Sequence, residues 1–193
     1  DRLGLSLPYP VLAARVNYKV QSLNFVLYKP KDIEFIDGTS ESGRRCYIRS
    51  LSMLTACAVN GLWPGCDLRL EHPISNGFYC TLRDAAGKVL TLTSDMITQL
   101  KQRMQLIVEQ DRTFVTEERQ TKEVIRLFSS RNVGQATLFE TLGNPYCRYY
   151  RMGDYIDYYT GALVPSTGYL QVYDVVSYQD NLLLRIPSRE NPE

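Results

Sequence analysis

Residues 49–80 read RSLSMLTACAVNGLWPGCDLRLEHPISNGFYC, a pattern that indicates a buried helix, a turn and then a strand. We expect the helix to end before WPG at 63–65, because proline cannot continue a helix and glycine frees the turn. Residues 44–48, RRCYI, read as a short strand that leads into the helix. Apolar residues recur at helical spacing and predict one buried helix face: Leu51, Leu54, Ala58 and Leu62.

The composition is that of an ordinary globular protein. The 193 residues can bury the core of one or two small domains. A net charge of +1 gives no argument for a nucleic-acid or membrane surface, and no apolar run is long enough to span a membrane. The five cysteines are irregularly spaced, which favours reduced thiols and a cytoplasmic location over a disulfide framework. Because the chain starts without methionine, we expect it to be a piece of a longer protein.

The chain before the helix predicts a small unit of strands over residues 1–38. Strands at 11–17 and 20–23 flank a tight turn, and residues 32–37 alternate polar and apolar side chains as a half-buried strand does. An arbitrary β-meander is the alternative for this unit. Residues 38–43, GTSESG, read as a linker, and residues 44–187 as a second unit.

Three further helices are expected in the second unit. Thr93 or Ser94 caps a helix whose buried face holds methionines and aliphatic residues. Thr116 caps another that runs to residue 128, and a third covers 135–142. From residue 146 the chain is rich in tyrosine, which suits half-buried strands, although a stacking surface for bases is an alternative. Asp154 and Asp157 read as solvated.

The helix and strand of the opening stretch resemble the second additional domain of threonyl-tRNA synthetases, the module that edits mischarged tRNA. The family's helix opens His-Ser-x-x-His, where this chain has Arg49-Ser50-Leu51-Ser52-Met53. The family's later motif Cys-x-Gly-Pro-His-Val-Pro-x-Thr-Gly is similar to residues 159–168, with Tyr159 at the cysteine position and Leu163 at the histidine position. Residues 8–38 resemble the TGS module, a β-grasp domain that precedes the editing domain in synthetases. The resemblance implies an α+β fold with a TGS-like unit followed by an editing-like unit.

A narrower resemblance is to the N-terminal half of bacterial nucleoside kinases of the uridine kinase and phosphoribulokinase family. It rests on residues 74–80, 163–169 and 183–187. It implies that residues 188–193 begin a linker to a P-loop kinase domain of the same chain, a transferase that uses ATP and Mg²⁺. The chain itself has no P-loop, because its one Gly-Lys pair, Gly87-Lys88, is followed by valine. The leading hypothesis is therefore a non-catalytic accessory region of a nucleoside kinase, which holds no cofactor itself.

Two alternatives differ in class from this hypothesis. One is an aminoacyl-tRNA deacylase or a tRNA- or ligand-binding module, although near-neutral charge disfavours a nucleic-acid partner. The other is a protein-interaction module. The single histidine, His72, lacks ligand partners at metal-binding spacing and reads as a structural residue.

The editing positions predict a site without metal. Arg49 has no lone pair to give, Leu163 has no donor atom, and Met53 and Tyr159 are poor zinc ligands. With Arg49 expected at the start of its helix, Arg49 and Tyr159 would line a pocket for an anionic or hydroxyl-bearing small ligand. The equal alternative is that Met53 and Leu163 fill the pocket and Arg49 pairs with an acidic neighbour.

Overall fold

The computed structural model describes residues 9–129 and 133–187 and divides the chain into two compact units. The first combines Asp1–Arg112 with Gly161–Glu193, and the second is Thr113–Thr160. The expected linker at 188–193 and the first eight residues lie outside the described part. None of the described helices has the length and apolar character needed to cross a membrane. The predicted domain boundaries at residues 38 and 44 stay predictions.

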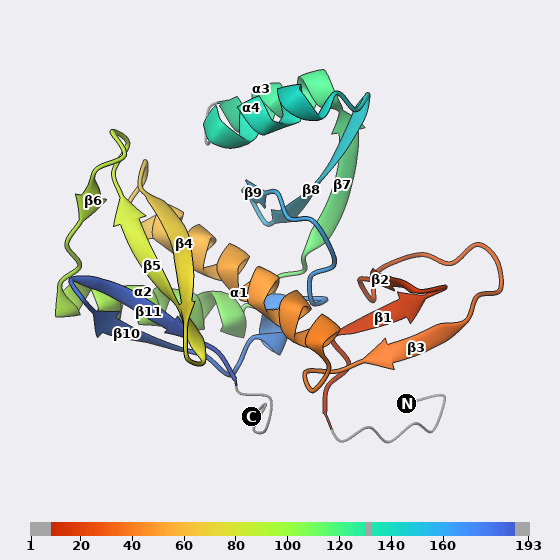
Figure 1. Ribbon diagram of the computed structural model, residues 1–193, viewed down its shortest axis with the longest axis horizontal. Coiled ribbons are helices and arrows are strands. Elements are labelled where there is room, and N and C mark those ends of the chain that lie inside the picture. The colour runs from red at the N-terminus through yellow and green to blue at the C-terminus, as the bar shows by residue number, and fades with distance from the viewer. Residues whose placement is uncertain (1–8, 130–132, 188–193) are drawn as a thin grey trace. The chain divides into compact units, whose positions relative to one another are not determined.

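The first unit begins with a three-stranded antiparallel sheet in the order β2-β1-β3 (Figure 1). The strands are β1 (Ala13–Val16), β2 (Lys19–Gln21) and β3 (Ile33–Ile36). Asn17 and Tyr18, with φ of 44° and 70°, make the tight turn between β1 and β2. The three strands predicted before residue 38 are therefore present.

Helix α1 (Glu41–Leu62) begins eight residues before the expected position of Arg49. The prediction of a strand at 44–48 is wrong because Ser40 caps a helix there, its hydroxyl accepting a hydrogen bond from the Gly43 amide at 3.0 Å. Glu41 and Arg45, one turn apart, form an ion pair that also favours the helix. The helix ends at Leu62, immediately before the predicted WPG stop.

The main sheet of this unit is antiparallel, with the order β10-β11-β5-β4 and β6 beside β5. Helix α2 (Ser94–Glu109) starts at its predicted Thr93 cap and packs against α1 and β10, while α1 packs against β4. Both predicted apolar helix faces are thus buried in one unit. The strands are β4 (Asp67–Ile74), β5 (Gly77–Arg83), β6 (Val89–Leu90), β10 (Asp174–Tyr178) and β11 (Asn181–Arg185).

The second unit packs two helices, α3 (Thr121–Ser129) and α4 (Val133–Leu142), on an antiparallel sheet of order β7-β8-β9. Its core is built mostly from Phe128, Phe139 and Tyr149, whose rings meet edge to face. The tyrosine-rich segment forms strands as predicted. The strands are β7 (Val115–Gln120), β8 (Tyr146–Met152) and β9 (Tyr155–Asp157).

The prediction that a helix begins after Thr116 is wrong, because residues 115–120 pair along their whole length with β8. Glu117 forms an ion pair with Arg151, and Glu118 forms one with Arg148. These cross-strand pairs place opposite charges side by side and stabilise the strand over a helix. The helix starts only at Thr121. The predicted α+β class is confirmed, since helices pack on separate antiparallel sheets in both units.

Candidate functional site

The first part of the candidate site is a set of hydrogen bonds between α1 and the segment that follows Thr160. Arg49 lies two turns inside α1, so the prediction that it begins the helix is wrong, and the argument from the helix dipole fails with it. Its guanidinium donates two hydrogen bonds to the Ala162 carbonyl, from Nε at 3.2 Å and from Nη2 at 3.0 Å. Arg49 thus binds a backbone oxygen. The partner expected from the sequence was either an anionic ligand or an acidic neighbour.

Gly161 lets the guanidinium come this close. Its φ is +127°, a conformation that other residues rarely adopt, and a Cβ there would lie 3.0 Å from Cζ of Arg49. The glycine of the late motif therefore serves the contact with Arg49. Position 161 tolerates no larger residue without moving the arginine.

Ser50 makes a second hydrogen-bonded contact with this segment, which was not predicted from the sequence. Its buried hydroxyl accepts a hydrogen bond from the Val164 amide at 2.9 Å and donates one to the Cys46 carbonyl at 2.8 Å. The signal for it was present, because serine follows the first position of the helix motif in both this chain and the resembled family. Arg49 and Ser50 together hold residues 162–164 against α1.

Met53 and Leu163 are core residues in the structure. Both side chains are fully buried, each with 0% exposure. This favours the alternative in which apolar side chains fill the old pocket. Tyr159 belongs to the second unit, where its hydroxyl donates a hydrogen bond to Asp157 at 3.0 Å.

Thr167 and Gly168, at the end of the motif in residues 159–168, form hydrogen bonds with the end of α2 and the residues that follow it. Thr167 Oγ1 donates to the Ile107 carbonyl at 2.7 Å and accepts from the Arg112 amide at 2.8 Å. The Gly168 amide donates to Asp111 at 3.0 Å, and a Cβ at position 168 would lie only 2.4 Å from that carboxylate. These motif residues are explained by backbone geometry, and none of these contacts needs a catalytic role.

Asp157 is the buried carboxyl of the second unit, so the prediction that it is solvated is wrong. Only 8% of the residue is exposed. It accepts hydrogen bonds from Gln135 at 2.6 Å, from the Tyr158 amide at 2.7 Å and from the hydroxyls of Tyr159 and Tyr155 at 3.0 and 3.4 Å. Burial raises the pKa of Asp157, and the hydrogen bonds oppose that shift. Asp157 is the last residue of strand β9 and the only buried one of its three residues.

The thiols and the histidine offer little chemistry. Burial raises the pKa of both Cys46 and Cys80 to about 12, so neither is a thiolate at neutral pH. His72 is exposed on β4 and packs against the Tyr79 ring at 5.3 Å. In the part of the chain that the structure describes, no three His, Cys, Asp or Glu residues gather as metal ligands would.

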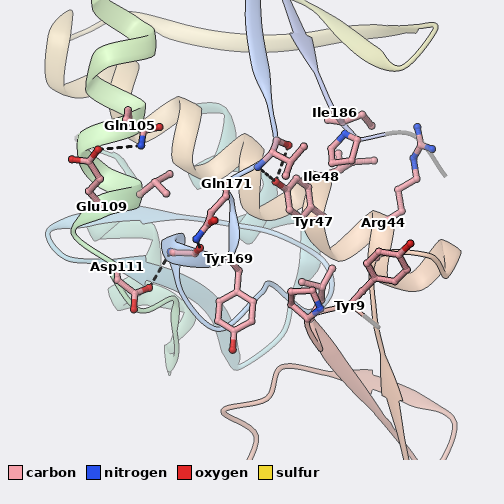
Figure 2. Close-up of a pocket in the computed structure, with 17 residues that line it drawn as sticks. Tyr9, Arg44, Tyr47, Ile48, Gln105, Glu109, Asp111, Tyr169, Gln171 and Ile186 are labelled. Atoms are coloured by element: carbon pink, nitrogen blue, oxygen red, sulfur yellow. Dashed lines mark hydrogen bonds between the residues drawn. The ribbon is translucent and has the colours of Figure 1, made fainter. Parts of the chain in front are cut away.

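A separate cleft of about 1170 Å³ lies in the first unit (Figure 2). Its walls come from the first turns of α1, the last turn of α2 and the segment around the short 3-10 helix η1 (Thr167–Tyr169). Arg44 stands on the α1 side, and Glu109 and Asp111 stand on the α2 side. The four residues predicted as a site are absent from its walls.

Comparison of the sequence with known proteins finds similarity to one class of protein. No family model matches the chain. It is similar to threonine–tRNA ligases: 29% identical to that of Syntrophomonas wolfei over 86% of this chain and 26% of the relative. The ligase of Rubrobacter xylanophilus is 26% identical over 91% of this chain and 27% of the relative. That of Marinobacter nauticus is 27% identical over 89% and 26%. The chain spans about a quarter of the length of these relatives.

These relatives correct the narrower expectation. They are named threonine–tRNA ligases, so the assignment to a nucleoside or uridine kinase is wrong, together with the transferase and ATP-binding character that went with it. The broader resemblance to threonyl-tRNA synthetases is the one that the comparisons support.

Proposed function

We propose that this chain is an editing-like module of a threonyl-tRNA synthetase-related protein that binds tRNA without deacylating it. The similarity to threonine–tRNA ligases over most of the chain supports the association with tRNA. The expected loss of deacylation rests on the residues at the editing positions. Met53 and Leu163 place buried apolar side chains there, and Arg49 donates hydrogen bonds to the Ala162 carbonyl.

Hydrolysis of an aminoacyl ester requires an activated water. An activated water needs a metal ion or a general base held beside the scissile bond. Arg49 is a permanent cation without a lone pair, and neither Met53 nor Leu163 can accept a proton. The chain keeps the hydrogen bonds that hold residues 162–164 against α1 and lacks, at the editing positions, a group that could activate a water.

Near-neutral charge sets the expected mode of tRNA binding. With a net charge of +1, the chain can neutralise few phosphates, so binding should be weak and only shallowly dependent on salt. Contacts to the unpaired acceptor end suit such a module better than a long electrostatic groove. We therefore still expect a low affinity for nucleic acids in general. The weak binding that we do expect is to tRNA.

Fluorescence anisotropy with labelled tRNA tests the binding half of the proposal. We expect saturable binding to tRNA with an intact CCA end and a clear loss of affinity when the terminal nucleotides are removed. A duplex RNA of the same length is the control for charge. Equal affinity for all three RNAs, or none for any, would contradict the proposal.

A further inference from the structure

The cleft in Figure 2 has opposite charges at its two ends, and each lacks an ion-pair partner among the residues that the structure describes. Arg44 lies in the first turns of α1, and the neighbouring Glu41 pairs with Arg45 instead. Glu109 is the last residue of α2, and Asp111 follows two residues later. Three charged groups therefore line one cleft with no salt bridge to any described residue.

The helices strengthen this polarity. The N-terminal end of a helix favours an anion, and the C-terminal end favours a cation. Arg44 stands near the N-terminal end of α1, while Glu109 and Asp111 stand at the C-terminal end of α2, whose last turn has no basic residue. Side chains and helix ends thus act in the same direction at both ends of the cleft. Glu109 also helps to raise the pKa of nearby Tyr173 to about 12, after the larger effect of burial.

The middle of the cleft is fixed and largely apolar. Tyr47 is buried, and its hydroxyl is used internally, donating to the Val172 carbonyl at 2.8 Å and accepting from the Val172 amide at 3.1 Å. Tyr9 and Tyr169 present further ring surface to the cleft. Such walls bind the body of a ligand and leave orientation to the charged ends.

We propose that this cleft binds an elongated zwitterion, with a protonated amine at Glu109 and Asp111 and a carboxylate or phosphate at Arg44. A volume of about 1170 Å³ exceeds what a single free amino acid needs and suits an amino-acid conjugate or a short peptide. This proposal does not depend on the tRNA function, because none of the editing positions lines the cleft.

Calorimetric titration of the whole chain with two probe families tests the proposal and separates the sources. One is tetra-alanine with free termini, compared with its N-acetyl and C-amide forms. The other is an amide-linked 3′-aminoacylamino adenosine monophosphate, compared with its N-acetyl form and with the phosphate-free nucleoside. At least one zwitterion should bind, and removal of either charge should weaken it by about tenfold, as expected for a charged hydrogen bond.

Variants assign each charge to its end. Glu109→Gln with Asp111→Asn should abolish the preference for a free amine and keep the preference for the anionic form; both changes retain an acceptor for Gln105 and for the Gly168 amide. Arg44→Gln should do the reverse. Arg126→Gln and Glu140→Gln, exposed residues outside the cleft, are the matched controls and should change neither preference. Failure of both probe families to bind, or variants that weaken charged and capped probes equally, would overturn the proposal.

Discussion

Arg49 has a structural role in this chain. The residue sits where the resembled family places a histidine, and its two hydrogen bonds now hold a backbone carbonyl. Arg49→Ala should lower the free energy of unfolding of the first unit by about 1–3 kcal/mol, because a part-buried carbonyl loses its charged donor. Urea denaturation measures this. Arg45→Ala, which breaks an exposed ion pair, should cost under about 1 kcal/mol, and an equal loss in both variants would contradict the assignment.

Gly161 provides an independent test of the same contact. Gly161→Ala should destabilise the fold by more than about 1 kcal/mol, since it combines a left-handed φ with a Cβ pressed against Arg49. Gly87→Ala is the matched control, with φ of +81° and no atom within 4 Å of a new Cβ. In an Arg49→Ala background the cost at position 161 should fall toward that at 87. An unchanged cost would show that strain alone explains the effect.

Asp157 should give the second unit a pH-dependent stability. Its folded pKa is raised above its ordinary value of 3.8, so the folded state holds the proton more tightly than the unfolded state. The contribution of Asp157 to the free energy of unfolding is therefore largest below pH about 4 and falls as pH rises through the raised pKa. Asp157→Asn should flatten this fall, as thermal unfolding from pH 3 to 8 would record. Glu140→Gln should leave it unchanged, and a stability difference between wild type and Asp157→Asn that stays constant across this range would contradict the assignment.

At the residue scale, the sequence located the site better than it explained it. The two motifs correctly indicated that the segment containing Leu163 contacts the helix that carries Arg49. The role of Arg49 could not be predicted, because a hydrogen bond to a carbonyl over 100 residues away leaves no local pattern. Asp157 was missed for a similar reason, because its partner Gln135 lies on α4, 22 residues away in sequence.

Helix α1 carries a matched pair of glycines whose substitution should have opposite effects. A Cβ at Gly43 would lie 1.8 Å from the Asp37 carbonyl, whereas at Gly61 the nearest atom is the Arg103 guanidinium at 3.5 Å. Gly43→Ala should therefore destabilise the chain by about 1–3 kcal/mol through a clash with rigid backbone. Gly61→Ala should stabilise it by up to about 1 kcal/mol through helix propensity. Equal melting shifts in the two variants would contradict this packing.

Among the elements, helix α2 was predicted from its local signals, whereas strand β7, which depends on pairing, was not. Helix α2 has its Thr93 cap and regular apolar spacing, and the chain folds as that pattern indicates. Strand β7 reads Val-Thr-Glu-Glu-Arg-Gln, a local sequence that suits a helix start, yet it pairs with β8 over six residues. Partners some 30 residues away in sequence decide its state, so local propensity fails there.

For the molecule as a whole, the proposed function implies an editing-like fold without the groups that would activate a water. Both units have the antiparallel sheets and covering helices expected of an α+β editing-like region. The polar positions that would activate a water are occupied by an arginine bound to backbone and by buried apolar side chains. Arg49, Met53 and Leu163 contribute hydrogen bonds and packing to this fold.

The most direct test of this account is single-turnover hydrolysis of mischarged aminoacyl-tRNA by the purified chain, with and without added zinc. The account predicts a hydrolysis rate equal to that in buffer under both conditions, in the same samples that show tRNA binding. Hydrolysis clearly faster than buffer, in the presence or absence of zinc, would contradict it.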